Sequence, residues 1–185
     1  QVGRIIDALQ KNGLAENTMV VFTSDHGLAV GSHGLMGKQN LYEHSTRVPL
    51  LIVGPGIAAG SVCEQPVYLH DLVPTISDWA RIDAPEFSEG KSLVGLLNGT
   101  SEQGRSSIYT AYKKVQRAIR VGRWKLIRYP AVDRTQLFDL VSDPHEMKDL
   151  SDDPENAQIL KKMLHRLKEL RIQASDPLVK SPDSR

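Results

Sequence analysis

Two short apolar runs, residues 18–24 and 49–53, most constrain what this chain can fold into. Both are rich in β-branched and other apolar residues and show almost no alternation with polar ones. Such strands are typical of a largely parallel sheet that is covered on both faces. Residues 2–9 precede the first run with apolar residues at helical spacing, and residues 71–80 follow the second run with another helical pattern, for which Asp71 is the expected N-cap. The sequence therefore predicts an α/β fold.

The pattern changes after residue 106. Four short runs suited to strands follow one another, at residues 107–112, 116–121, 124–129 and 136–140, and residues 121–124 have the composition of a hairpin turn. Asp153 and Pro154 then form a cap and first-turn pair ahead of an apolar stripe that ends near Leu170. We therefore predict three parts: an α/β part over residues 1–106, a small antiparallel sheet covered by a C-terminal helix over residues 107–172, and a loose tail over residues 173–185.

Composition excludes several classes of protein. The 185 residues include 23 basic and 22 acidic side chains, and no cluster of Lys and Arg is interleaved with aromatic residues, so we expect no nucleic-acid partner. The apolar runs are too short to cross a membrane, and a single cysteine, Cys63, excludes an internal disulfide.

The strongest chemical signal is the sequence Asp25-His26-Gly27 directly after the first apolar run. In open α/β sheets, ligands bind beyond the carboxyl ends of the strands. Adjacent Asp and His side chains offer an oxygen and a nitrogen to a cation, and glycine allows the backbone to turn sharply behind them. A strand-end aspartate beside an incidental histidine is the alternative interpretation.

The loop that follows carries a more specific pattern. Residues 31–50 read GSHGLMGKQNLYEHSTRVPL, and this stretch resembles the corresponding loop of the type I sulfatases, in the alkaline phosphatase superfamily. Further segments at residues 54–57, 71–75, 90–93 and 137–146 resemble the second half of the same family. The resemblance implies the C-terminal part of an alkaline-phosphatase-like α/β sandwich.

The resemblance also implies roles for individual residues. Asp25 and His26 correspond to ligands of a Ca²⁺ ion, and Lys38 corresponds to the lysine that contacts the sulfate. A histidine rather than an asparagine at position 26 resembles the iduronate-2-sulfatase branch. The implied substrate is a sulfated small molecule or carbohydrate, and family members commonly act in the periplasm or elsewhere outside the cytosol.

The family nucleophile is a formylglycine made within a Cys/Ser-x-Pro/Ala-x-Arg motif, and no segment of this chain fits that motif. Cys63 is followed by proline one place late, and Ser101 and Ser181 have Gln103 and Asp183 where proline or alanine belongs. We therefore expect the formylglycine, the remaining calcium ligands and the rest of the catalytic domain upstream, and we expect this chain alone to be inactive.

Other residues of the loop have two interpretations each. His33 could protonate the leaving oxygen or could only stabilise the loop, and His44 could contact the substrate or orient the loop. Glu43 and Arg47 are interpreted as a structural pair.

The sequence is also compatible with two functions other than a sulfatase. A phosphodiesterase or phosphonate monoester hydrolase of the same superfamily would act on an ester of similar geometry. A non-catalytic carbohydrate-binding module could retain the fold without the nucleophile.

Overall fold

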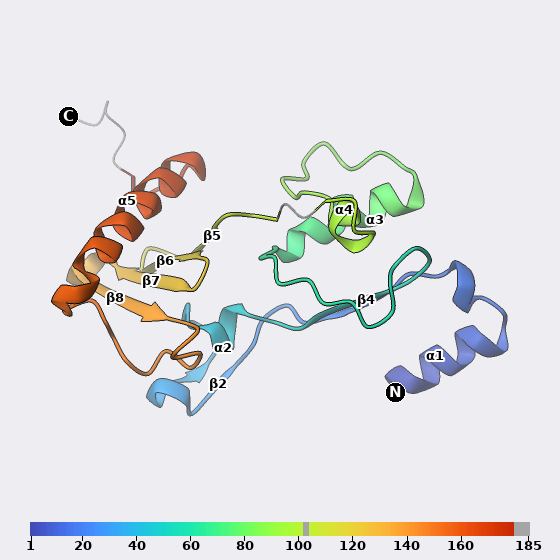
Figure 1. Ribbon diagram of the computed structural model, residues 1–185, viewed down its shortest axis with the longest axis horizontal. Coiled ribbons are helices and arrows are strands. Elements are labelled where there is room, and N and C mark those ends of the chain that lie inside the picture. The colour runs from blue at the N-terminus through green and yellow to red at the C-terminus, as the bar shows by residue number, and fades with distance from the viewer. Residues whose placement is uncertain (102–103, 180–185) are drawn as a thin grey trace. The chain divides into compact units, whose positions relative to one another are not determined.

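The computed structural model describes residues 1–101 and 104–179, which form two compact units (Figure 1). The first unit combines residues 1–25 with residues 49–105. The second unit combines residues 26–48 with the chain from Ser106 onward. The boundary between the units at residues 105 and 106 lies close to the predicted end of the α/β part at residue 106. The sequence did not predict that residues 26–48 belong with the C-terminal sheet.

The first unit contains helices and one pair of strands. Its regular elements are α1 (Val2–Lys11), β1 (Val20–Thr23), β4 (Leu50–Val53), α3 (Leu72–Ala80) and α4 (Val94–Leu97). β1 and β4 pair antiparallel with each other, with Val20 opposite Val53, whereas their composition is typical of a largely parallel sheet. Side chains of β4 alternate between half-buried and exposed, with Leu51 56% exposed, so the expectation that both faces are buried was wrong for the described residues. Apolar composition alone encodes neither the direction of the partner strand nor what covers it.

Asp71 caps the 3-10 turn Leu69–Asp71 that leads into α3, rather than α3 itself. α3 begins at Leu72 as expected, but the Asp71 side chain makes no capping hydrogen bond to it. Instead the carboxylate accepts hydrogen bonds from the backbone N–H groups of Tyr68 and Lys91, each at 2.8 Å, and pairs with Arg105. The buried carboxylate therefore joins three segments of the first unit.

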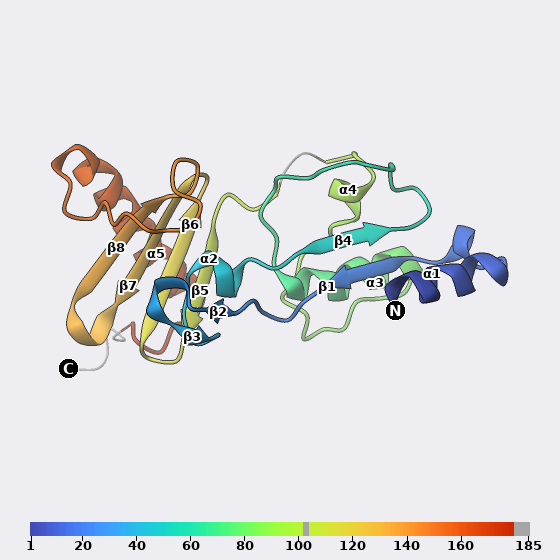
Figure 2. The same cartoon turned by 90° about the horizontal axis from the view of Figure 1, so that it is seen from below.

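The second unit is built on a four-stranded antiparallel sheet (Figure 2). Its strands are β5 (Ile108–Tyr112), β6 (Gln116–Val121), β7 (Trp124–Tyr129) and β8 (Arg134–Asp139), in that order across the sheet. The hairpin turn is confirmed, with Val121 opposite Trp124. Asp153 accepts a hydrogen bond from the N–H of Glu155 at 3.0 Å, ahead of α5 (Ala157–Gln173). The predicted strands and helix of this part are confirmed.

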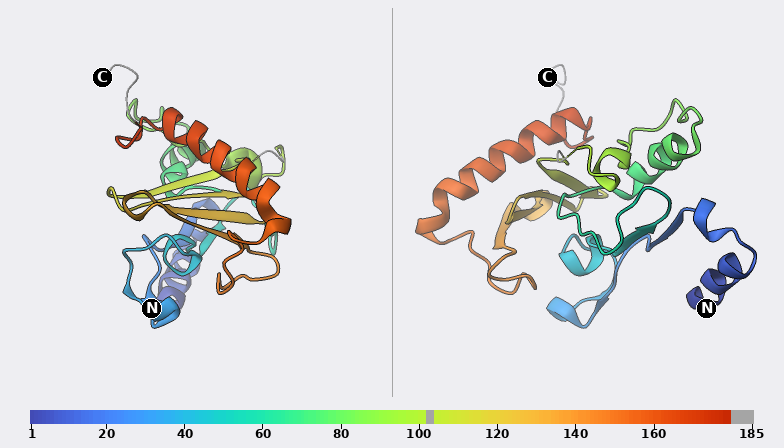
Figure 3. Two further views of the ribbon diagram at one scale, coloured as in Figure 1. Left: turned by 90° about the vertical axis from the view of Figure 1, so that its left-hand side faces the viewer. Right: turned by 45° about the vertical axis from the view of Figure 1, so that its right-hand side comes forward.

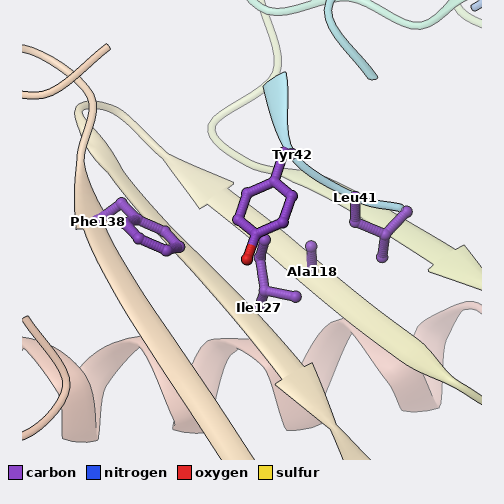
Figure 4. Packing of buried hydrophobic residues seen from close by; sticks show 5 residues of the cluster. All are labelled: Leu41, Tyr42, Ala118, Ile127 and Phe138. Atoms are coloured by element: carbon purple, nitrogen blue, oxygen red, sulfur yellow. The ribbon is translucent and has the colours of Figure 1, made fainter. Parts of the chain in front are cut away.

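The two faces of this sheet carry different layers, because neighbouring residues of a strand point to opposite faces. α5 covers one face (Figure 3), where the packed side chains are Ile119, Leu126, Leu137, Met163 and Leu167. On the other face Leu41 and Tyr42 pack against three strand residues, as Figure 4 shows: Ala118, Ile127 and Phe138. The loop over residues 26–48 is therefore the second covering layer of the sheet.

The loop has internal structure of its own. It contains a small hairpin, β2 (Ala29–Val30) with β3 (Met36–Gly37), and a short helix α2 (Glu43–Thr46). Gly27 N–H donates to the Ser45 carbonyl at 3.0 Å, which brings the two ends of the loop together. A Cβ added at Gly27 would collide with the carbonyl oxygen of His44, so this close approach requires glycine.

A buried ion cluster ties the end of the described chain to the sheet. Asp176 accepts hydrogen bonds from Arg117 at 2.6 and 2.8 Å, from Arg171 at 2.8 Å and from the Tyr109 hydroxyl at 2.8 Å. Hydrogen bonding to Arg117 holds the pKa of Asp176 well below its usual range. Residues 174–179 of the predicted tail are thus anchored through Asp176, and residues 180–185 lie outside the described residues.

We predict that Asp176→Asn lowers the free energy of unfolding by about 3 kcal/mol at pH 7, because it leaves Arg117 buried without a charged partner. The folded-state pKa of Asp176 lies below that of an unfolded aspartate, about 3.9, so the pair stabilises the fold above that pH. The difference in the free energy of unfolding between wild type and variant should therefore become smaller as pH falls below about 4. Denaturant titration at several pH values measures it, with Glu169→Gln in the exposed pair with Arg166 as a control of little effect. A variant as stable as wild type at pH 7 would contradict this account.

We predict that Gly27→Ala destabilises the protein by about 1–3 kcal/mol, because the new methyl group must displace the backbone at His44. The matched control is Gly3→Ala, where an added Cβ meets nothing within 4 Å and alanine favours the helix. The midpoint of urea denaturation should fall for the first variant and stay or rise for the second. Equal midpoints would show that the close approach does not constrain the loop.

Candidate functional site

The candidate site begins where β1 ends. Asp25 and His26 follow Thr23 and Ser24 without any intervening regular structure, and the Asp25 side chain is exposed at this point. Ser24 Oγ lies 3.5 Å from Asp25 Oδ1. Asp25 is the last residue of this segment of the first unit, and His26 is the first residue of the second unit.

His26 and Lys38 are brought together in the second unit. Lys38 Nζ lies 2.5 Å from His26 Nε2, and His26 Nδ1 lies 3.0 Å from the carbonyl oxygen of Gly27. A carbonyl oxygen can only accept a hydrogen bond, so this contact assigns the ring proton to Nδ1. The lone pair of Nε2 is then directed at the lysine ammonium. A metal ion bound at Nε2 would take the place of this ammonium, because the nitrogen has a single lone pair.

His33 belongs to a ring cluster rather than to this pair. Its ring stacks on Tyr42 with centroids 3.9 Å apart and planes 6° apart, and its Nε2 lies 3.0 Å from the carbonyl oxygen of His145. His33 also has a left-handed backbone, with φ of 55°. The contact with the carbonyl places a proton on Nε2, so a neutral His33 ring has Nδ1 as its acceptor.

His44 lies beside the same rings. Its centroid is 5.5 Å from that of His33 and 5.7 Å from that of Tyr42. Burial lowers the pKa of His44, and the nearby His33 and Lys125 lower it further, so the neutral ring is favoured at neutral pH. Within residues 1–101 and 104–179, its buried Nε2 has no hydrogen-bond partner.

A charged network under the loop was not predicted from the sequence. Lys125 Nζ lies 2.8 Å from Glu43 Oε1 and 2.8 Å from Glu146 Oε1, and Arg120 lies 3.2 Å from Glu43 Oε2. Glu43 is therefore paired with Lys125 and Arg120, and the predicted side-chain pair with Arg47 is wrong, since Arg47 contributes only its backbone N–H to the Glu43 carbonyl. The sequence holds one partial signal, because Glu146 lies in the family-like segment 137–146.

The metal ligands expected from sequence can form only part of a coordination shell. Calcium takes six to eight oxygen ligands. Asp25 offers a carboxylate and His26 offers Nε2, a donor set that suits a divalent cation in part. Among the residues that the structure describes, no group of three or more His, Cys, Asp or Glu side chains is placed to hold a metal ion. No described helix is both long and apolar enough to span a bilayer.

The chain is similar in sequence to proteins of known family. Residues 31–173 match the family model described as N-sulphoglucosamine sulphohydrolase, C-terminal. The choline-sulfatase of Rhizobium meliloti (strain 1021) is 39% identical over 164 residues, which cover 83% of this chain and 31% of that protein. The chain spans about a third of the length of the curated relatives it matches.

Solved structures agree with the sequence match. One, described as a complex with its substrate D-glucosamine-2-N,6-O-disulfate, has a TM-score of 0.85 and 31% identity over 95% of this chain and 38% of its own. The phosphonate monoester hydrolase of Silicibacter pomeroyi has a TM-score of 0.83 and 26% identity over 93% and 38%. The predicted fold, the C-terminal part of an alkaline-phosphatase-like α/β sandwich with a small sheet and a C-terminal helix, is confirmed. This chain therefore belongs to the sulfatase family.

Proposed function

We propose that the protein containing this chain is a sulfuric ester hydrolase that cleaves sulfate monoesters of carbohydrates. The observation that carries the proposal is the contact between Lys38 and His26, in a loop that lies mostly within the matched family region. The related structure with a disulfated glucosamine supports the carbohydrate class.

The residues of this chain fit such a reaction chemically. Charge moves toward the leaving oxygen as the S–O bond breaks, so a positive group held beside the sulfate stabilises the transition state more than the ground state. Lys38 would supply one such charge as an exposed ammonium that donates to sulfate oxygens. Asp25 and His26 would hold a Ca²⁺ ion together with ligands outside this chain, and the ion would replace the Lys38 ammonium at His26 Nε2. Bound calcium would add positive charge and orient the sulfate.

The two further histidines have subordinate roles in this proposal. For His33 to protonate a leaving oxygen through Nδ1, its ring must carry both protons, because Nε2–H is engaged with His145. His44, favoured in its neutral form, would donate a hydrogen bond to a substrate oxygen.

Several finer statements belong to the same proposal. The nucleophile would be a formylglycine contributed from outside residues 1–185, so the chain by itself would not turn over. His26 in place of asparagine supports a placement near the iduronate-2-sulfatases, and family resemblance supports a location outside the cytosol.

A second candidate is hydrolysis of phosphonate or phosphate esters. It is favoured by the similarity to the phosphonate monoester hydrolase of Silicibacter pomeroyi. Sulfate and phosphate esters share tetrahedral geometry, so the Lys38 ammonium and a bound Ca²⁺ ion could stabilise the transition state of either ester.

The test is sulfate release from a simple aryl sulfate by the full natural protein with calcium, with aryl phosphate and phosphonate esters as controls. The proposal requires release by the full protein, loss of release on chelation, and no release by residues 1–185 alone. Preferential hydrolysis of a control ester would establish the second candidate. No hydrolysis of any ester would favour a non-catalytic carbohydrate-binding role.

We predict that Lys38→Ala in the full protein lowers kcat/KM for the sulfate ester about 100-fold or more, because one charge that stabilises the transition state is lost. The thermal midpoint should stay unchanged, because Lys38 is exposed. The control is Lys161→Ala, which removes an equally exposed lysine from α5. Unchanged turnover in Lys38→Ala would remove this residue from the site.

A further inference from the structure

We propose that Glu146 is a positioning residue for Lys38, acting through the chain from Lys38 to Glu43. The proposal rests on the proposed function for the role of Lys38. Its structural part, that Glu146 anchors this segment, stands on contacts within the second unit and can be tested without a substrate.

The anchor is a hydrogen bond between a buried carboxylate and the backbone of the loop. Glu146 is 2% exposed, and its Oε2 accepts a hydrogen bond from the N–H of Glu43 at 2.6 Å. Glu43 is the first residue of α2, so this N–H has no partner within the helix. The carboxylate therefore supplies the acceptor that holds the start of α2.

Lys125 completes the anchor by bridging two acidic side chains. Its Nζ lies 2.8 Å from both Glu43 and Glu146, and the lysine is itself only 2% exposed. The bridge connects β7, the loop and the segment after β8, which are far apart in the sequence. Glu146 has a left-handed backbone, with φ of 57°, a conformation that side chains rarely adopt. Its carboxylate is thus held against the loop despite an unfavourable backbone.

A short series of contacts leads from this anchor to Lys38. Asn40 Oδ1 accepts a hydrogen bond from the N–H of Tyr42 at 3.2 Å, and Asn40 N–H donates to the Lys38 carbonyl at 2.8 Å. Asn40 is 5% exposed, and Tyr42 is packed on the sheet. The Lys38 side chain is therefore exposed, while its backbone leads into the buried residues Asn40 and Tyr42, ahead of the helix start that Glu146 holds.

The residue before Glu146 contacts the other side of the same loop. The His145 carbonyl lies 3.0 Å from His33 Nε2, five residues ahead of Lys38. Residues 145 and 146 thus hold the loop on both sides of Lys38. A displacement of about 1 Å in a group that binds the reacting centre can cost on the order of a hundredfold in rate.

Two conservative variants distinguish the effect of the length of the side chain at position 146 from the effect of its charge. Glu146→Asp keeps the charge but withdraws the carboxylate from Glu43 N–H, and we expect it to lower kcat/KM at least about tenfold in the full protein. Glu146→Gln keeps an acceptor of the same length, and we expect it to stay within about threefold of wild type, because Glu43 still balances Lys125. The matched control is Asp176→Asn, a buried carboxylate whose partners all lie outside residues 26–48.

Amide hydrogen exchange over residues 38–47 measures whether Glu146 holds the loop, and kcat/KM is the readout that a merely structural role would not move. Exchange should accelerate at least about tenfold in Glu146→Asp and stay unchanged in Asp176→Asn, even where both lose stability. Unchanged exchange in Glu146→Asp, or accelerated exchange with wild-type kcat/KM, would overturn the proposal. If wild type hydrolyses no sulfate ester, the proposed function fails, and the exchange result alone decides whether Glu146 anchors the loop.

Discussion

The packing of residues 26–48 against one face of the four-stranded sheet is the interaction on which the rest of the second unit depends. Side chains alternate across β6, β7 and β8, so one set meets α5 and the other meets Leu41 and Tyr42. A loop of this length would otherwise have few apolar contacts of its own. The sheet thus supports the segment that carries His26 and Lys38.

This arrangement combines a rigid base with an exposed charge. Tyr42 and Asn40 are buried, whereas Lys38 is exposed, and the ammonium lies against an imidazole whose tautomer is set by Gly27. The buried carboxylate of Glu146 holds the start of α2, and that of Asp176 ties the end of the described chain to the sheet. Under the proposed function, the exposed Lys38 would bind the anion while the buried part of the loop belongs to the fold.

Local patterns predicted local structure well. The strands over residues 116–121 and 124–129, their hairpin and the capped C-terminal helix follow from periodicity and turn residues alone. The antiparallel pairing of β1 with β4 and the role of Asp71 as a junction depend on partners far along the chain, which no local pattern encodes. For the same reason the sequence did not predict the network of Glu43, Lys125 and Glu146, whose members are far apart in the chain. Asp25 and His26 were singled out by their place at the end of the first apolar run, the role of Lys38 came only from family resemblance, and these roles stay predictions.

The most direct test of the account is a crystal structure of the full natural protein with calcium and sulfate bound. The account predicts Asp25 and His26 among the ligands of the cation, Lys38 Nζ within hydrogen-bond distance of a sulfate oxygen, and Glu146 still accepting from the N–H of Glu43. A sulfate bound away from Lys38, or a cation that contacts neither Asp25 nor His26, would contradict it.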